Sequence, residues 1–530
     1  MKIKQKILCF TMVSILIFSM NVSGTKISKN STQYEIGESI DTIQNCLIIP
    51  SNEDEGDLDP LVDLQVTVTI KEIRALDKID FIGKPDFYVK VFINDEMSKS
   101  KIWRNQKYVN ETWSTTVDVP DDEQNVTIKI QLWDAFPLID RICDLSENYN
   151  REQLFGHKYD IDLVYNLKIG HWMGEDNNNP FSWSPDLSGY GRLNGCDDNS
   201  IYQRDRDCLI LFDITQNDYD GDGIPYWTEV NVYGTDPEVD DTGRDDDDDG
   251  VPIEWEHKWG SFIGWDWHNH TRQLKFYWTY HPFEAEDHAH LDPDDDGLDN
   301  IEEYLVSEWG SDPFRKDIFV ELDQMEAGPN GEPVSMLTEW AKDLLRDAFD
   351  RQNIVLHIDD GNMGGGEILP FDNETNDSEL VQLYEDYFLH GEENLWRRSV
   401  FHYGLIVYEA SYGGFVFGTN DSYWGAFQIA SKRIDKKMGI PTAKRRAVAY
   451  ASVYMHELGH TLQIDMPGGH DQKSKGPWHI RWWKWHPYKS TMNYRYTYLL
   501  VDYSDGSRGK NDHDDWSTLN LKAFQGIYVD

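Results

Sequence analysis

Positive charge is scarce in this chain of 530 residues, in which 49 Lys and Arg stand against 95 Asp and Glu. The formal net charge is -46. So few cations cannot neutralise a phosphate backbone, and the composition therefore excludes a nucleic-acid partner. The acid excess suits a small cation such as calcium. Because the length exceeds what one hydrophobic core supports, we expect several folded units.

Long apolar runs are lacking beyond the N-terminus. The run at residues 7–20 follows Lys2, Lys4 and Lys6 and precedes Val22-Ser23-Gly24, which is the arrangement of a secretory signal peptide. It is short for a membrane span, which needs about 20 apolar residues. We predict a cleaved signal over residues 1–24 and a secreted or cell-surface protein, with an uncleaved anchor as the alternative. Sites for N-glycosylation fit export: Asn30, Asn110, Asn125, Asn269, Asn373, Asn376 and Asn420.

Cysteine is rare, with five in the whole chain. Cys9 falls in the predicted signal and leaves Cys46, Cys143, Cys196 and Cys208, which suffice for two disulfides in an exported protein. The spacing allows three connectivities. One hypothesis pairs Cys143 with Cys196 and Cys46 with Cys208, and the other keeps four free, buried thiols.

Residues 61–215 have the pattern of an antiparallel β-sandwich and follow a polar, acidic linker at residues 25–60. The runs QVTVTIKEI, DFYVKVFI, NVTIKIQLW and LILFDI alternate apolar and polar residues, with turn residues between them. Such alternation is typical of strands with one buried face. We therefore expect an all-β first domain.

The first domain resembles a C2 domain, from the run at Leu64 to Val91 through Glu111-Thr112-Trp113 to Leu132-Trp133-Asp134. In C2 domains, aspartates from two loops bind calcium through hard oxygen ligands. The matching residues here are Asp80, Asp86 and Asp134, although Phe136 stands where a further aspartate is expected. The resemblance implies calcium-dependent contact with a membrane or cell surface, and a structural spacer is the alternative.

Three acidic loops share one twelve-residue pattern between residues 216 and 314. Carboxylates at positions 1, 3 and 5, glycine at 6 and glutamate at 12 are the pattern of a calcium-binding loop. Three copies favour structural calcium over a disordered acidic linker. Their tails, GTDP and GSDP, resemble thrombospondin type 3 calcium repeats, which implies a stiff stalk. The predicted ligands are Asp218, Asp220, Asp222 and Glu229; Asp245, Asp247, Asp249 and Glu256; and Asp292, Asp294, Asp296 and Glu303.

The motif His456-Glu457-Leu458-Gly459-His460 lies in a proline-free, helix-forming run from Ala443 to Gln463. Four-residue spacing places both histidines on one face of a helix, where neutral imidazoles can bind zinc. Glu457, beside them, is placed to take a proton from water. We predict His456 and His460 as zinc ligands and Glu457 as the general base.

The segment from Lys316 onward has α/β character, with expected strands at 318–322, 354–358, 401–408 and 424–429 and expected helices at 336–349 and 380–398. With this order, the zinc motif and the later run Ser490-Thr491-Met492-Asn493-Tyr494, residues 315–530 resemble metzincin zinc proteases. The resemblance implies peptide or protein substrates, Met492 as the floor under the zinc histidines, and Tyr494 at the oxyanion.

The third zinc ligand departs from the metzincin pattern. Gln463 and Met466 occupy the positions at which those proteases have a glycine and the last ligand. The sequence turns instead at Pro467-Gly468-Gly469, which is followed by His470. We favour His470, with Asp465, His479 and His486 as alternatives. A two-histidine site without zinc is the remaining possibility.

The sequence thus predicts a multidomain protein: a signal peptide (1–24), a linker (25–60), an all-β C2-like sandwich (61–215), a calcium-loop repeat region (216–314) and an α+β metzincin-like protease domain (315–530). The predicted function is that of a secreted zinc endopeptidase with catalytic Zn²⁺ and structural Ca²⁺. The first alternative is a calcium-dependent surface or adhesion protein with an inert protease fold. The second is a C2 protein recruited to membranes.

Overall fold

The computed structural model describes residues 46–48, 56–80, 83–137, 139–146, 159–174, 191–196, 206–268, 271–391, 393–417, 425–464 and 477–522. The chain divides into one unit at residues 1–45 and another at residues 46–530. The predicted signal peptide lies outside the described residues. Among the helices that are described, none is long and apolar enough to cross a membrane.

Two antiparallel sheets form a sandwich whose core comes from the alternating runs predicted above. One sheet has the order β10-β9-β7-β3-β4 with β8 beside β7, and the other has the order β11-β12-β2-β5 with β6 beside β2. Alternate residues of β2 and β7 are buried between the sheets, which confirms the all-β prediction. The strands are β2 (Gln65–Ala75), β3 (Phe87–Ile93), β4 (Glu96–Lys99), β5 (Tyr108–Val109), β6 (Trp113–Asp118), β7 (Asn125–Asp134), β8 (Arg141–Ile142), β9 (Ile161–Asn166), β10 (His171–Gly174), β11 (Gly191–Asn194) and β12 (Cys208–Gln216).

The disulfide hypothesis is wrong, because Cys143, Cys196 and Cys208 are buried and form no disulfide in the part of the chain that the structure describes. The bridge between Asp144 and Asp207 places Cys143 beside Cys208, which share a hydrogen bond. Cys196 packs instead against Leu76 and Leu209. Spacing could not reveal this, since the neighbours of each thiol are set by strand pairing far along the chain.

Short helices follow the three acidic loops in the next part of the chain. They are α2 (Tyr226–Thr228) with η2 (Glu229–Tyr233), α3 (Ile253–Trp255) with η3 (Glu256–Gly260), and α4 (Asn300–Leu305) with η4 (Ser307–Trp309). A hairpin of β13 (Ser261–His268) and β14 (Thr271–Trp278), which the sequence pattern did not indicate, lies between the second and third loops. β14 also pairs with β1 (Cys46–Ile48), so these three residues of the predicted linker belong to a sheet.

A mixed sheet organises the last part of the chain, with the order β16-β15-β18-β20-β19 and β17 beside β15. Its strands run parallel except β19, which is antiparallel to β20 at one edge. The strands are β15 (Asp317–Met325), β16 (Val355–Asp359), β17 (Ile368–Leu369), β18 (Phe401–Val407), β19 (Gly414–Phe417) and β20 (Ala426–Ala430). The helices are α5 (Glu339–Asp350), α6 (Asp377–Leu383) with η5 (Tyr384–Phe388), α7 (Arg397–Val400), α8 (Ser431–Met438), α9 (Ala443–Thr461), α10 (Ile480–Lys484) and η6 (Trp516–Thr518).

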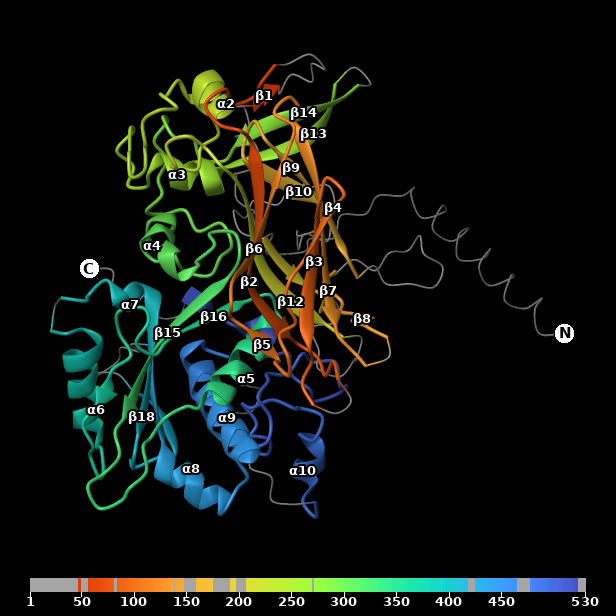
Figure 1. The fold of residues 1–530 in the computed structure, drawn as a ribbon. Helices are drawn as coiled ribbons and strands as arrows, with labels where there is room; N and C mark the ends of the chain where they lie inside the picture. The colour runs from red at the N-terminus through yellow and green to blue at the C-terminus, as the bar shows by residue number, and fades with distance from the viewer. Residues whose placement is uncertain are drawn as a thin grey trace, which may run out of the picture. The chain divides into compact units, whose positions relative to one another are not determined.

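Helices α5 and α9 run together against this sheet (Figure 1) and share one core, which includes Leu345, Phe349 and Met455. A second core contains residues of α6, η5 and β18. Helix α9 begins where the Thr442 hydroxyl accepts the Arg445 N–H, and it ends before Gln463, whose φ of 51° is left-handed. The packing of α9 on the sheet therefore fixes the position of the motif that it carries.

Candidate functional site

The two histidines of the motif lie on one face of α9, as predicted. Their ring centroids are 4.9 Å apart and the rings are nearly perpendicular. His456 is buried, whereas His460 is partly exposed. The last two turns of α9 thus hold a pair of imidazoles where solvent reaches one of them.

A backbone carbonyl sets the tautomer of His456. Nδ1 of His456 lies 2.8 Å from the carbonyl oxygen of Thr491. Because a carbonyl only accepts hydrogen bonds, Nδ1 carries the proton and the lone pair of the neutral ring is on Nε2. Zinc-binding histidines are commonly oriented in this way by a second partner. The contact comes from the segment that the sequence identified through Met492.

Met492 lies under the motif helix and is fully buried. A Cβ atom built on Gly459 would stand 2.6 Å from Met492 Sδ and 2.9 Å from the Tyr503 hydroxyl. Glycine between the two histidines therefore lets the turn at 490–494 approach the helix. Thr491 anchors this turn, since its hydroxyl donates to the Ser452 carbonyl of α9 at 2.6 Å.

Tyr494 packs against His456, the buried histidine of the pair. Its ring stacks on His456 with centroids 5.3 Å apart, and the residue is 37% exposed. Tyr494 is therefore partly open to solvent and lies against the first histidine of the motif.

Glu457 is buried beside the edge strand β19, where its carboxylate contacts Gly414. Burial raises the pKa of Glu457 to about 8. A divalent cation held by the adjacent histidines would favour the ionised form and lower this pKa again.

The favoured third ligand, His470, and its alternative Asp465 lie outside the described residues. His479 is the N-cap of α10, where its Nδ1 accepts the Arg481 N–H. The Nδ1 atom of His486 lies 3.3 Å from the Tyr496 hydroxyl oxygen. The choice among these residues therefore stays a prediction.

The three acidic loops adopt one backbone conformation. Position 6 is glycine with left-handed φ in each loop, at 87° in Gly223, 104° in Gly250 and 106° in Gly297. The carboxylate at position 5 accepts the N–H of position 7 in each, as Asp296 does from Leu298 at 2.8 Å. This geometry turns the carboxylates at positions 1, 3 and 5 inward, and each set has oxygens within 4.8 Å of one another.

Buried oxygens without hydrogen-bond partners show that the loops fit a cation. Among the described residues, neither carboxylate oxygen of Asp247 or of Glu303 has a hydrogen-bond partner. Burial and, after it, repulsion from neighbouring carboxylates raise the pKa of Glu256 and of Asp294 to about 10. A bound divalent cation would satisfy these oxygens and remove the repulsion.

The structure adds residues to these loops that the twelve-residue pattern did not include. Glu286 and His288 join Asp249 and Glu256, with His288 Nε2 at 3.2 Å from Asp249 Oδ2. Asp241 joins the first loop, although it also forms an ion pair with Arg244. The additions come from neighbouring segments, so no loop motif signals them.

The third loop is tied to the mixed sheet. Asp317, the first residue of β15, donates its N–H to Asp296 at 2.6 Å, and its own carboxylate accepts from His357 at 2.6 Å. Lys522, near the end of the chain, forms ion pairs with Asp292 and Asp295, both at 2.7 Å. Hydrogen bonds of Asp317 therefore connect the third loop to the mixed sheet.

Two of the three aspartates that the C2 resemblance identified form ion pairs with one arginine. Arg141 of β8 forms ion pairs with both Asp80 and Asp134. Asp86 accepts the Asn105 N–H at 2.7 Å and pairs with Arg104 at 3.2 Å. The structure thus brings Asp80 and Asp134 together, as predicted, with a guanidinium group between them. Calcium binding by these three aspartates stays a prediction.

Comparison with known proteins identifies the first domain. The family model for the C2 domain matches residues 64–142, so the chain contains a C2 domain there. No curated protein matches the chain.

Solved structures that resemble the chain also contain C2 domains. A structure described as that of a C2 domain is 14% identical and covers 29% of this chain and 98% of its own, with a TM-score of 0.17. A structure of two C2 domains of extended-synaptotagmin 2 is 12% identical over 36% of this chain and 47% of its own, with a TM-score of 0.17. A C2 domain protein from Ramazzottius varieornatus is 12% identical over 28% and 88%, with a TM-score of 0.16. Each of these likenesses is confined to a minor part of this chain.

Proposed function

We propose that residues 315–530 are a zinc-dependent endopeptidase domain of metzincin type. The observation that carries the proposal is the hydrogen bond from His456 Nδ1 to the Thr491 carbonyl, which presents Nε2 to a metal. His456, His460 and a third ligand, His470 by preference, would hold the ion. Zinc bound there would lower the pKa of a coordinated water toward neutrality and polarise a peptide carbonyl.

The residues around the histidines fit peptide hydrolysis. Glu457 takes the proton of the attacking water and gives it to the leaving amine, as a buried carboxylate beside the site can do. In this proposal, the Tyr494 hydroxyl donates a hydrogen bond to the oxyanion that forms at the carbonyl, and the stacking of its ring on His456 supports that role. Met492 packs against Gly459 and holds the turn at 490–494 against the motif helix. These roles agree with what the resemblance to metzincins implies.

The edge strand β19 supports a peptide as the substrate. β19 is the terminal strand of the described sheet, and its Gly414 contacts the Glu457 carboxylate. An unpaired strand edge can bind an extended peptide through main-chain hydrogen bonds. A substrate aligned on β19 would bring one of its peptide bonds to Glu457.

The zinc ligands can be tested by metal analysis of purified protein. We expect about one zinc per chain in the wild type and its loss in His460→Ala. His470→Ala should also lose zinc, whereas Asp465→Ala should keep it. His290→Ala serves as the control, because its side chain is 81% exposed and lies outside the motif. Zinc retained in His470→Ala and lost in Asp465→Ala would show that Asp465, and not His470, is the third zinc ligand.

A second role, membrane contact through the C2 domain, is favoured by exposed apolar residues beside its aspartates. Phe136 is 45% exposed and Ile139 is 77% exposed, in the loop between β7 and β8. Such residues at a loop tip can enter the interfacial region of a bilayer. We propose that this loop holds the protein at a membrane or cell surface, in keeping with the contacts that C2 domains make.

Membrane contact can be measured by flotation of the full chain with phosphatidylserine vesicles in calcium. The double variant Phe136→Ser, Ile139→Ser is expected to bind about tenfold more weakly, because two apolar side chains no longer enter the bilayer. Ile440→Ser is the control, since Ile440 is fully exposed on another part of the chain. Equal flotation of the double variant and the control would contradict the proposal.

A further inference from the structure

A buried histidine lies among three acidic side chains beside the second acidic loop. The cluster consists of Asp249 and Glu256, which precede the hairpin of β13 and β14, and of Glu286 and His288, which follow it. Each residue offers one potential ligand atom, and these atoms all lie within 4.8 Å of one another. His288 Nε2 is 3.2 Å from Asp249 Oδ2 and 3.9 Å from Glu286 Oε2. The four side chains are therefore close enough to bind one ion.

Three atoms of this cluster are buried and have no hydrogen-bond partner among the described residues. They are Glu256 Oε1, Glu286 Oε2 and His288 Nε2. His288 is fully buried and Glu256 is 1% exposed. Buried polar atoms are normally satisfied. Because these three belong to one cluster, a single cation bound among them would satisfy all of them.

The other ring nitrogen of His288 is held by Asn300, which is also fully buried. Asn300 Nδ2 lies 2.8 Å from His288 Nδ1, and Asn300 Oδ1 lacks a partner in the described part of the chain. A half turn of the amide exchanges these two atoms and lets the oxygen accept the Nδ1 proton. Nε2 then carries the lone pair of the neutral ring, which is the state of a metal-binding histidine.

Two aromatic rings fix the orientation of the imidazole. Trp255 and Tyr280 both meet the His288 ring edge to face, with centroids 5.8 Å and 4.8 Å from it. They belong to the small core beside the loop. The nitrogen ligand is therefore held in place before an ion binds.

The histidine distinguishes the second acidic loop from the other two. In every loop, the carboxylate at position 5 accepts the backbone N–H of an acidic residue from a later segment. The donors are Asp241, Glu286 and Asp317, at 3.3, 3.1 and 2.6 Å. Two residues farther along the chain, the first loop has Gly243 and the third has Phe319, whereas the second has His288. At this position, only the second of the three loops has a nitrogen ligand.

We propose that this cluster binds a divalent transition metal, with Mn²⁺ as the ion that best fits the ligands. Calcium prefers oxygen ligands alone, whereas imidazole suits transition metals. Three carboxylates beside one imidazole favour manganese among these metals, because it also accepts hard oxygen ligands.

The second loop then holds two different ions next to each other. Asp249 belongs to this cluster and also to the group of Asp245, Asp247 and Asp249 at the predicted calcium position. The metal joins the chain before the hairpin of β13 and β14 to the chain after it, and so fixes both ends of the hairpin. Neither the peptidase nor the zinc of α9 enters this inference.

Electron paramagnetic resonance of the full chain in saturating calcium measures manganese binding. His460→Ala serves as the background, because it removes a proposed zinc ligand of α9 and so disfavours manganese there. We expect about one Mn²⁺ per chain that calcium does not displace. The spin-echo signal of the bound ion should be modulated by a directly bound nitrogen, which loops with oxygen ligands alone cannot supply.

In that background, His288→Gln should bind Mn²⁺ at least about tenfold more weakly and lose the nitrogen modulation, because one of the ligands is removed. His290→Gln is the matched control, since His290 is 81% exposed, and it should keep both. Glu286→Gln should also bind about tenfold more weakly but keep the modulation.

Thermal unfolding without manganese shows whether each variant folds. Glu286 is 27% exposed, so Glu286→Gln keeps the test valid if the buried His288→Gln does not fold. Equal manganese affinity in His288→Gln and His290→Gln would overturn the inference. Bound manganese without nitrogen modulation, displacement of manganese by calcium, or unchanged affinity in Glu286→Gln would overturn it as well. None of these outcomes depends on peptidase activity.

Discussion

The variant Glu457→Gln is expected to hydrolyse peptides about a thousandfold more slowly than the wild type, because the amide cannot accept the proton of the attacking water. The side chain keeps its size, so it should retain its place against Gly414 of β19. His456 and His460 are unchanged, and zinc content should therefore stay at the wild-type level. The rate is measured on an unfolded protein substrate, with metal analysis of the same samples.

A matched control separates catalysis from a general effect of the substitution. Glu393→Gln makes the same chemical change at an exposed position outside the motif and should be fully active. Wild-type activity in Glu457→Gln would show that another group acts as the base. If the wild type holds no zinc and hydrolyses no protein, the alternative of an inert protease fold on a calcium-dependent surface protein is the better one.

Removal of calcium is expected to lower the midpoint of thermal unfolding by about 10 °C. A ligand at about 1,000 times its dissociation constant stabilises the folded state by about 4 kcal/mol, and 1 kcal/mol shifts the midpoint of a domain of 150 to 250 residues by about 2 to 4 °C. The third loop should contribute most to the stability of the mixed-sheet part of the chain, since Asp296 accepts the N–H of Asp317 at the start of β15. Calorimetry in calcium and in EGTA measures the shift.

The variant Glu303→Gln tests whether Glu303 is a calcium ligand, and the expected change in thermal stability differs between calcium and EGTA. In calcium it should be less stable than the wild type, because the carboxylate that can bind the ion bidentately is lost. In EGTA it should be at least as stable, because one of several buried, mutually repelling carboxylates is neutral. Glu238→Gln, exposed in the same region, should follow the wild type in both. A wild-type midpoint of thermal unfolding that is the same in calcium and in EGTA would contradict a structural role of calcium.

Local patterns predicted most of the strands and helices that position the candidate site. The alternating runs became β2, β3, β7 and β12, and the proline-free run became α9, because strand and helix periodicities depend on neighbouring residues. The hairpin β13 and β14 and its pairing with β1 were missed. Pairing between residues 46–48 and 275–277 joins segments far apart in the chain, and no local pattern encodes it.

The sequence by itself determined which side chains can do chemistry. The spacing of His456 and His460 places both on one face of any helix, and the glycines of the acidic loops allow the left-handed turns that point the carboxylates inward. These features depend on residues within a few positions of one another. The predicted metal ligands can therefore be named without knowledge of the fold.

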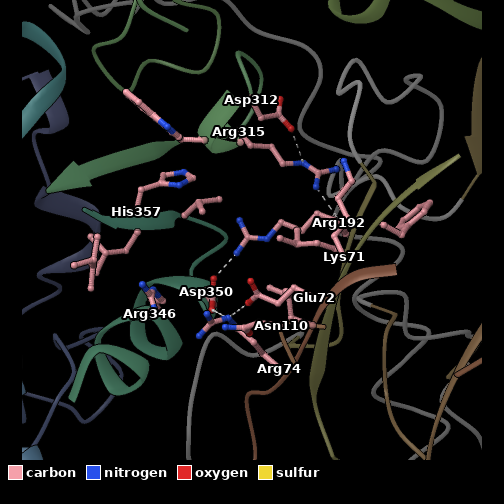
Figure 2. A pocket seen from close by; sticks show the side chains of 18 of the residues that line it. Lys71, Glu72, Arg74, Asn110, Arg192, Asp312, Arg315, Arg346, Asp350 and His357 are labelled. Carbon is pink, nitrogen blue, oxygen red and sulfur yellow. Dashed lines mark hydrogen bonds and ion pairs between the residues drawn. The ribbon is translucent and has the colours of Figure 1, made fainter. Parts of the chain in front are cut away.

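Only the tertiary structure decided what surrounds those side chains. The Thr491 carbonyl fixes the tautomer of His456, and Arg141 stands between Asp80 and Asp134. Arg74 and Arg192 of the sandwich strands form ion pairs with Asp350 of α5 (Figure 2). Each contact joins distant parts of the chain, and it exists because burial of separate apolar faces brings those parts together. Partners, burial and charge balance follow from that packing, which the spacing of residues along the chain does not specify.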